Sequence, residues 1–575
     1  MFDNLKSILD DVGIDTPWEL VERFATFPRW KPEDVNASCD MIVERLKRHG
    51  VPVTVLEADL YLSIPYEASV QAEGKTYRAK PPSYGVPAPG GLEGELVYVP
   101  ATYSKSVGTL FQKNQDPEMS KPDRLRGKIV ISEGFAFPQK IHEFEQAGAI
   151  GVIAVNPGVD IHWGICTSIW GTPDLDDLPR KPGIPVVAVN NPDGKALIEL
   201  AGRKGRCKLF SKLDEGWFMQ KLPVVEIKGK EQPEKFVLIA GHYDSWDVGI
   251  GDNATGDATL LEIARVLWKH RDKLKRSVRI AWWPGHSTGR YAGSTWFADK
   301  FALDLDANCV AQLNCDSPGC RWATEFKDIS WMKETEGFAQ GLIKEVTGLP
   351  AHGERPHRAG DYAFNNIGIS SLFMLSSTMP DKLREQKGYY TVGGCGGNIA
   401  WHTEHDTIEI ADRDIMVRDI KVYLGSVLRI ANAEVLPFDW RATVAEFQET
   451  IDKYQKAAGN HFSLAPSREE ADALAASLAK FHQAVEQKRV PTGKANAVIE
   501  RLARILVPIN YTRAPRFRHD PATPVPALPT IATATELAQH EGAKLGFAKT
   551  QLMRGQNRLV AALREARGMV DAAMA

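Results

Sequence analysis

The stretch 236–293 constrains what this chain can fold into more than any other segment. Two apolar runs in it, 236–240 and 277–283, have the length and composition of buried strands. Between them lies a segment in which leucine and alanine recur at helical spacing. A strand, a helix and a second strand in close succession predict an open α/β sheet.

Side chains that bind metals stand at the ends of these elements. His242 and Asp244 follow the first strand, and His286 follows the second. Asp252 ends a glycine-rich loop at the start of the helix. Ligands of open α/β sheets bind just outside the carboxyl ends of the strands. Imidazole and carboxylate groups gathered there predict a divalent-metal site, although for any one histidine alone a satisfied loop residue is the better explanation.

The motif HYDSWDVGIGDNATG, with the glycine-containing turn after the second strand, resembles the zinc aminopeptidase and glutamate carboxypeptidase–transferrin receptor family. The resemblance implies a metallopeptidase fold and two zinc ions bridged by one aspartate. His242 then falls on the first ligand, Asp252 on the bridging ligand and Asp244 on the acid that supports the ligand histidine. Asp316, which ends another apolar run, and His402, in the segment WHTEHDT, match two further ligands.

The chain departs from the family pattern at His286 and Ser287. The family carries two adjacent glutamates there; the first is the general base and the second binds one metal. Neither role transfers unchanged, because both carboxylates are missing. His286 is predicted to be either a new base or a replacement ligand, and not both, since a metal-bound nitrogen no longer accepts a proton. The hydroxyl of Ser287 is neutral and a weak ligand.

The retained ligands predict the cofactor. Zinc is expected, with one ion held by His242, Asp252 and Asp316, because three protein ligands and an open position are typical of catalytic zinc. A second ion on Asp252 and His402 is left open, as is another divalent metal. Asp244 is expected to orient His242 and so to belong to the catalytic set together with the residue at position 286.

Several residues near the predicted centre are candidates for substrate contact. They are Ser287, Asp361, Cys395 and Trp401. Cys395 stands in a glycine-rich loop, and glycine permits close approach of backbone to a ligand. For Asp361 the alternative is a helix cap.

Length and composition limit the class of protein. A chain of 575 residues is expected to form two to four domains. The formal net charge of −3 gives no reason to propose a nucleic acid or an anionic membrane as partner. No apolar run reaches the length of a membrane span, and the N-terminus lacks the apolar core of a signal peptide. With seven scattered cysteines, typical of reduced thiols, these features predict a cytoplasmic protein.

Changes in composition along the chain predict four segments. Residues 1–61 carry helical patterns and, by the resemblance, belong to the catalytic domain, whose core is 226–435. Residues 62–225 alternate short β-like runs with glycine and proline. They resemble a protease-associated (apical) domain, which covers the active site in the family. Residues 436–575 are rich in Ala, Glu, Lys, Arg and Leu and resemble the family's helical dimerisation domain, so a homodimer is expected.

The same patterns predict individual elements. A buried strand is expected at 369–375. Helices of the last domain are expected at 444–457, 469–488, 495–506 and 535–574.

Three functions fit these observations. The first is a metal-dependent hydrolase of a peptide, amide or related C–N bond, with a remodelled centre and a peptide or small molecule as substrate. The second is a metal-dependent enzyme of another reaction class, such as a lyase, that uses the metal as a Lewis acid. The third is a non-catalytic binding or scaffold protein of the receptor type. Four retained ligand positions argue against the third, because a scaffold has no physical need of them.

Overall fold

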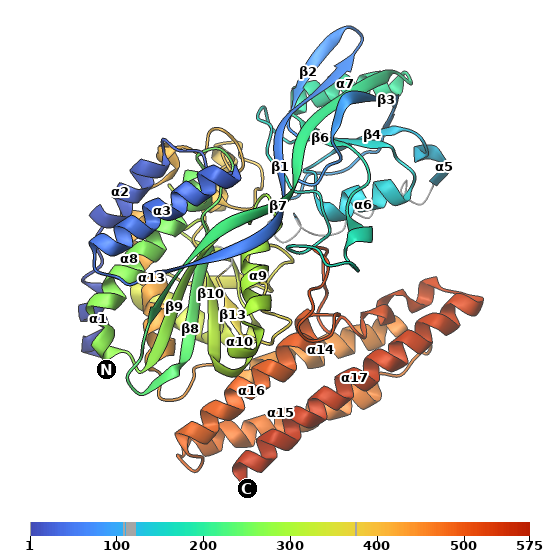
Figure 1. The fold of residues 1–575 in the computed structure, drawn as a ribbon. Helices are drawn as coiled ribbons and strands as arrows, with labels where there is room; N and C mark the ends of the chain where they lie inside the picture. Colours follow the sequence, from blue (N-terminus) through green and yellow to red (C-terminus); the bar gives the residue numbers. More distant parts are fainter. Residues whose placement is uncertain (1, 107–109, 111–121, 374–375) are drawn as a thin grey trace.

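The computed structural model describes residues 2–106, 110, 122–373 and 376–575. In its core, four parallel strands lie in the order β13, β10, β8, β9, and β7 pairs antiparallel with β9. These strands are β8 (Gln232–His242), β9 (Arg276–Trp283), β10 (Cys309–Asn314) and β13 (Ser371–Leu372). A β-rich part and a group of C-terminal helices complete the predicted α/β architecture (Figure 1).

Strand β8 is apolar throughout its second half because helices cover both faces of the sheet. Val237 and Ile239 pack into the cluster that contains α8 and α13, whereas Phe236 and Leu238 pack into the cluster that contains α9 and α10. The covering helices are α8 (Thr255–Lys269), α13 (Arg413–Asn432), α9 (Ala292–Lys300) and α10 (Ala302–Asn308). Burying each such side chain contributes roughly 1.5–3 kcal/mol, so this layer fixes the strand ends firmly.

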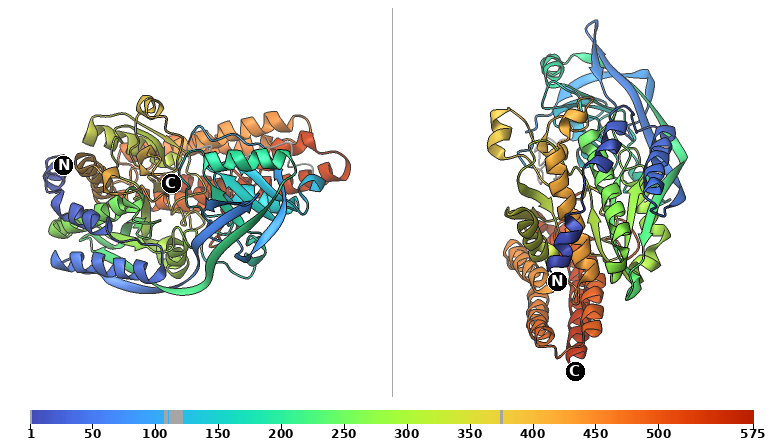
Figure 2. Two further views of the ribbon diagram at one scale, coloured as in Figure 1. Left: turned by 90° about the horizontal axis from the view of Figure 1, so that it is seen from above. Right: turned by 90° about the vertical axis from the view of Figure 1, so that its left-hand side faces the viewer.

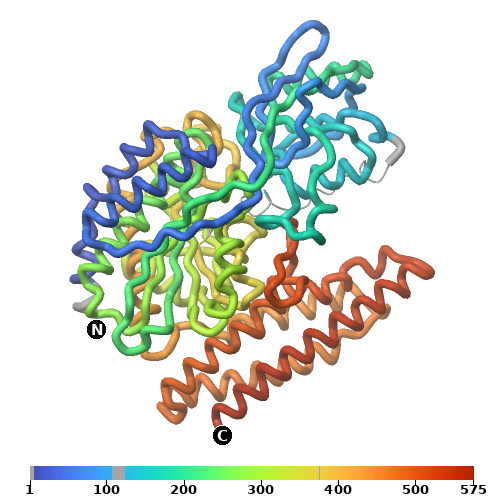
Figure 3. Tube along the Cα trace, in the orientation of Figure 1, coloured from blue at the N-terminus to red at the C-terminus, as the bar shows by residue number. Residues whose placement is uncertain are grey.

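Two long strands join the core to the β-rich part. β1 (Thr54–Ala72) and β7 (Arg206–Ile227) pair antiparallel along most of their length. They run side by side out of the core (Figure 3). The predicted boundaries after residues 61 and 225 lie inside these continuous strands. Because a ladder of backbone hydrogen bonds crosses the junction, the two parts are connected by sheet and not by a flexible linker.

The β-rich part is itself a layered unit. Its parallel strands are β3 (Ala88–Tyr98), β4 (Ile129–Glu133), β5 (Gly151–Val155) and β6 (Val186–Val189). Helix α6 (Pro138–Gln146) buries Ile141 in one apolar cluster, and α7 (Asn191–Gly202) buries Leu197 in another, so the helices cover opposite faces.

Four helices form the C-terminal part, which lies at the opposite end of the molecule from the β-rich part (Figure 2). They are α14 (Trp440–Ala458), α15 (Ala465–Glu486), α16 (Thr492–Tyr511) and α17 (Gly542–Met574). The single helix expected at 535–574 is wrong, because a 3-10 segment, Ala532–Gln539, ends before α17 begins. Gly542 has a φ of 52°, a left-handed conformation that breaks the helix and that glycine adopts readily.

The strand expected at 369–375 is shorter than predicted. It forms over Ser371–Leu372 only, because Phe373 adopts a left-handed φ of 63° that ends the pairing with β10. Residues 374–375 lie outside the described residues. The remaining elements are α1 (Phe2–Leu9), α2 (Asp15–Phe24), α3 (Pro32–Arg48), β2 (Lys75–Ala79), α5 (Pro122–Leu125), β11 (Phe326–Ser330), α11 (Glu336–Thr347), β12 (Ala351–Glu354) and α12 (Asp381–Gln386).

Membrane-spanning helices are absent from the part of the chain that the structure describes, since none of its helices combines sufficient length with sufficient apolar character.

Candidate metal centre

The structure brings the four predicted ligands together at the carboxyl edge of the core sheet. His242 is the last residue of β8, Asp316 follows β10, and Asp252 lies in the turn before α8. The His242 Nε2 atom lies 3.0 Å from Asp252 Oδ1 and 3.7 Å from Asp316 Oδ2. His402 Nε2 lies 3.1 Å from the other carboxylate oxygen of Asp252. Asp252 therefore stands between two imidazoles, the position that the resemblance predicts for the bridging ligand.

The unpaired polar atoms of this cluster fit a bound cation. His242 Nε2 and Asp252 Oδ1 are buried and, although close, make no hydrogen bond to each other or to other described residues. Burial opposes a charge on His242, but Asp252 and Asp316 hold its pKa well above the ordinary value. Buried carboxylates need a compensating positive charge, which a protonated imidazole or a bound cation supplies. Nitrogen and oxygen ligands in this arrangement suit zinc or a similar divalent ion.

The two histidines of the candidate centre are oriented by backbone carbonyls. His242 donates its Nδ1–H to the carbonyl oxygen of Asp244 at 2.8 Å. His402 donates its Nδ1–H to the carbonyl oxygen of Trp163 at 3.0 Å, and Trp163 N–H donates to the His402 carbonyl at 2.8 Å. Both bonds leave Nε2 with the lone pair that a metal requires.

Asp244 acts differently from the prediction. Its carboxylate does not contact His242, because the backbone carbonyl already occupies the Nδ1 position. Instead the two carboxylate oxygens accept hydrogen bonds from the backbone N–H groups of His286 and Ser287, each at 2.9 Å. Asp244 is fully buried, so it fixes the 286–287 turn against the end of β8.

Two further residues brace the ligand loops. Asp406 accepts hydrogen bonds from the backbone N–H groups of Gly251 at 2.7 Å and Asp252 at 3.0 Å. Burial raises the pKa of Asp406 to about 7. The amide nitrogen of Asn253 donates to the carbonyls of His242 and Cys315, which ties the ends of β8 and β10 to the Asp252 turn.

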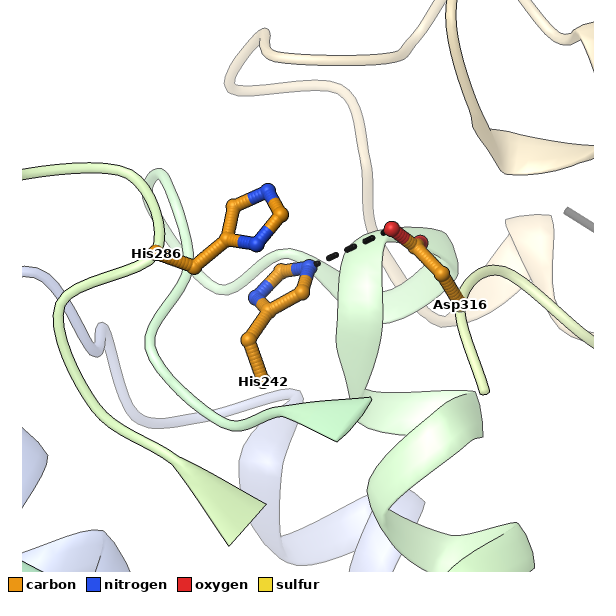
Figure 4. Close-up of side chains that lie close together, drawn as sticks. All are labelled: His242, His286 and Asp316. Atoms are coloured by element: carbon orange, nitrogen blue, oxygen red, sulfur yellow. Dashed lines mark ion pairs between the residues drawn. The ribbon is translucent and has the colours of Figure 1, made fainter. Parts of the chain in front are cut away.

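His286 forms a dyad with Asp361. Its Nδ1 atom lies 2.8 Å from Asp361 Oδ2, and the other oxygen of that carboxylate accepts a hydrogen bond from Ser294 Oγ at 2.5 Å. The His286 ring stacks on His242 with centroids 3.7 Å apart. Figure 4 shows the two rings face to face beside Asp316, and ligand atoms of these three residues lie within 4.8 Å of one another.

The structure separates the four predicted substrate contacts. A cavity of about 620 Å³ adjoins the centre, and of the four only Trp401 lines it. Asp361 is fully buried beneath His286 and starts no helix, so it is neither a cavity residue nor a helix cap. Ser287 and Cys395 are also buried away from the cavity, and the Cys395 thiol donates to Asp406.

Residues that the sequence did not single out form much of the cavity wall. They include Phe135, Phe137, Trp163, Arg290 and Tyr291. The first three come from loops of the β-rich part, so this part covers the centre directly. The aromatic content of the 161–170 loop was the available signal, and Trp170 of that loop packs on the cavity residue Tyr291 with ring centroids 4.3 Å apart.

Comparison with known proteins gives a consistent picture. Residues 224–424 match peptidase family M28, and residues 92–197 match the PA domain. A probable glutamate carboxypeptidase VP8 of Zea mays is 28% identical over 251 residues, 41% of this chain and 34% of that protein. Leucine aminopeptidase 2 of Trichophyton equinum is 28% identical over 269 residues, 45% of this chain and 48% of that protein. The chain thus spans between a third and a half of these relatives.

Solved structures share the fold at low sequence identity. A zinc aminopeptidase from Bacillus subtilis aligns with a TM-score of 0.54 and 19% identity over 74% of this chain and 96% of that one. A peptidase M28 precursor from Shewanella amazonensis aligns with a TM-score of 0.56 and 17% identity over 76% of this chain and 97% of that one.

Proposed function

Because this chain belongs to peptidase family M28 and carries a PA domain, we propose that it is a metal-dependent hydrolase of a peptide, amide or related C–N bond. The observation that carries the proposal is the position of Asp252 between His242 and His402, with buried polar atoms left for a cation. His242, Asp252 and Asp316 would hold the first ion, and Asp252 with His402 would contribute to a second. When bound, such an ion is a Lewis acid that polarises the carbonyl of the scissile bond.

We propose further that His286 is the general base of a remodelled centre. Asp361 accepts the Nδ1 proton of His286, which leaves the Nε2 lone pair to take a proton from the attacking water. Among the described residues Asp361 is the only ion-pair partner of His286, whereas the ligands contact one another. His286 lines the cavity, so the proton can pass from Nε2 to the leaving amine.

The test compares metal content and hydrolysis of a peptide panel in three proteins. These are the wild type, His286→Ala, and the double variant His286→Glu with Ser287→Glu. His286→Ala is expected to keep its metal and to lose about 10²–10⁴-fold in kcat, the usual contribution of a general base. Loss of metal in His286→Ala would make His286 a ligand, and unchanged turnover would refute the remodelled centre. A wild type with neither metal nor hydrolysis would refute the hydrolase proposal and favour a binding protein.

A further inference from the structure

Arg29 is a fully buried arginine whose guanidinium bonds to three backbone carbonyls of one loop, residues 243–249. It lies between α2 and α3, far from this loop in the sequence. Its Nε–H donates to the Tyr243 carbonyl at 3.0 Å. Its two terminal nitrogens donate to the carbonyls of Val248 at 2.7 Å and Gly249 at 3.1 Å. One side chain therefore holds both ends of the loop.

The backbone of Arg29 pairs with the same loop. The Ser245 N–H donates to the Arg29 carbonyl at 2.8 Å, and the Arg29 N–H donates to the Asp247 carbonyl at 3.1 Å. With the three side-chain bonds, Arg29 makes five hydrogen bonds to the segment that joins His242 to the turn carrying Asp252. The geometry between these two candidate ligands thus depends on a residue of the N-terminal segment.

The loop adopts a conformation that needs such support. Asp247 and Gly249 have φ values of 51° and 44°, in the left-handed region. A Cβ at Gly249 would lie 2.4 Å from the Asp252 carbonyl oxygen and 2.4 Å from the Ser245 Cβ, so only glycine fits there. Backbone in sparsely populated regions persists where its surroundings over-determine it. The five bonds of Arg29 supply that determination.

The Gly249 carbonyl connects Arg29 directly to the turn that carries Asp252. It accepts hydrogen bonds from the Arg29 guanidinium and from the Ala254 N–H at 3.1 Å. On the other side of the turn, Asp406 accepts from the Asp252 N–H at 3.0 Å. The Asp252 backbone is therefore held between two braces, one from each side, and Arg29 provides one of them.

The next residue, Trp30, extends the contact toward the second candidate histidine. Its ring lies 6.4 Å, centroid to centroid, from the ring of Trp163, whose carbonyl orients His402. The Trp163 Nε1–H donates to the carboxylate of Asp247 at 3.0 Å. The loop that Arg29 fixes thus also carries the acceptor that holds Trp163 in place.

Arg29 is charged, although no described carboxylate forms an ion pair with it. Burial lowers the pKa of Arg29 to about 10, against the opposing charges of Asp257, Asp406 and Asp244, so the guanidinium stays protonated at neutral pH. Its carbon lies 4.2 Å from the ring centroid of Phe24 on α2. A charge this close to the centre opposes a cation, so a benefit to metal binding has to come from position.

We propose that Arg29 is a positioning residue of the metal centre, which holds Asp252 in place between His242 and His402 through the carbonyls of the 243–249 loop. The proposal rests on the metal-dependent function proposed above and adds the N-terminal segment to the centre. A guanidinium presents five N–H donors in a rigid fork, and therefore reaches several carbonyls at once. The compact ammonium of a lysine does not match this fork.

The experiment measures zinc affinity of the full chain by competition with a chromophoric chelator, together with the visible absorption of the Co²⁺-substituted protein. Arg29→Met keeps the length of the side chain and removes every donor. It is expected to weaken zinc binding about 10–100-fold, the usual effect of losing an outer partner of a ligand. The Co²⁺ absorption should change as well, because it reports ligand geometry. Arg29→Lys keeps the charge and should recover only part of the affinity.

The matched control is a buried arginine at the opposite edge of the same sheet. Arg504 is 6% exposed and donates to the carbonyls of Gly368 at 2.8 Å and Cys309 at 2.6 Å, where Cys309 begins β10. Arg504→Met is expected to lower the melting temperature and to leave zinc affinity and the Co²⁺ absorption unchanged. An equal loss of affinity in Arg504→Met and Arg29→Met would reduce the effect to general destabilisation and overturn the proposal.

Other outcomes keep this proposal separate from the hydrolase function. Unchanged or tighter zinc binding in Arg29→Met would overturn the positioning role while the hydrolase function stands. If the wild type binds zinc but cleaves no peptide, the hydrolase function fails, and the affinities still decide the role of Arg29. A wild type that binds no divalent metal overturns both.

A measurement on the wild type decides the matter if the Arg29 variants do not fold. Coupling between two sites is reciprocal, so a segment that strengthens metal binding is itself stabilised by the metal. Zinc should therefore slow amide hydrogen exchange in residues 27–30 and in the 243–249 loop. Equal exchange of both segments with and without zinc would overturn the proposal.

Discussion

The two histidines of the metal centre are held by different regions of the molecule. His242 is oriented by the carbonyl of Asp244, two residues further along the same loop. His402 is oriented by the carbonyl of Trp163, 239 residues away in the sequence and on a loop of the β-rich part. One candidate ligand is therefore oriented by the core alone, whereas the other is oriented only with the β-rich part in place. The β-rich part therefore both covers the centre and helps to position one of its histidines.

The junction on the His402 side is built from buried, mostly neutral contacts. His162 donates its Nδ1–H to the Trp401 carbonyl at 2.6 Å and accepts from Tyr390 Oη at 2.7 Å. Burial lowers the pKa of His162 to about 3, so it stays neutral at physiological pH. Trp163 stacks on Trp246 with centroids 5.4 Å apart. These contacts hold the 161–164 loop against the ligand loop.

The largest expected effect is on bound metal, and it distinguishes Asp252, which both histidines contact, from His402, which the β-rich part orients. Asp252→Ala should remove essentially all bound metal, because Asp252 contacts both histidines. His402→Ala should leave at least one ion on the His242 side. Elemental analysis of the purified proteins measures both. Full metal occupancy in Asp252→Ala would show that the ligand set is wrong.

A smaller effect on metal affinity is expected from a variant that loosens the Trp163 carbonyl, which orients His402. Trp163→Ala removes the stack on Trp246 and the hydrogen bond to Asp247 Oδ2 at 3.0 Å, which position the Trp163 backbone. Metal affinity on the His402 side should fall about 10–100-fold, the usual effect of losing an outer partner. The control is Trp217→Ala, a tryptophan that is 59% exposed on β7. Equal affinities in the two variants would mean that His402 needs no help from the β-rich part.

A third variant perturbs the contact between the core and the C-terminal helices and should leave the metal content unchanged. Glu334 is buried between the core and α14, where it accepts hydrogen bonds from Ser370 Oγ at 2.7 Å and Thr443 Oγ1 at 3.0 Å. Burial raises the pKa of Glu334 to about 7. The folded state therefore keeps a proton that the unfolded state loses, so this contribution to stability is fully present below about pH 4.5 and is lost as pH rises through 7.

Glu334→Gln should remove that dependence, which is worth roughly 3 kcal/mol in all. Melting temperatures between pH 5 and 8 measure it, and the variant should gain on the wild type as pH rises. Glu345→Gln, a change at an exposed residue of α11, is the control. Parallel pH profiles for wild type and Glu334→Gln would contradict the assignment.

The smallest effect on the metal centre is expected from a substitution on the outer surface of the last helix, α17. We propose that the chain forms a homodimer through its C-terminal helices, where Phe547 is 75% exposed and Met553 55% exposed on α17. Phe547→Glu should weaken the dimer in light scattering while metal content stays the same. A wild type that is monomeric at micromolar concentration would refute the dimer.

The sequence predicts what is local and misses what is assembled at a distance. His242, Asp252 and the strand before them lie within one short segment, so their pattern predicts both the fold and the first ligand. The motif likewise selects Asp316 and His402, and the structure brings both to the same place as His242 and Asp252. The partner of His402, however, is a backbone carbonyl. Every residue has one, so the sequence does not show which carbonyl makes this contact.

The dyad of His286 and Asp361 shows the same limit for a contact between two side chains. Asp361 is a plausible cap or substrate residue in the sequence, because the 75 residues that separate it from His286 hide their contact. Asp244 was expected to reach His242 with its carboxylate, but the shorter path through its own carbonyl takes that place. Arg290 carried no signal in the sequence, because its place in the cavity wall can be recognised only in the folded chain.

We propose that this constellation hydrolyses a C–N bond with a bound divalent metal. The most direct test strips the wild-type protein with a chelator, restores zinc in steps, and follows metal content together with cleavage of the peptide panel. Turnover should vanish with the metal and return in proportion to the zinc bound. Undiminished turnover in protein that carries no detectable metal would contradict the account.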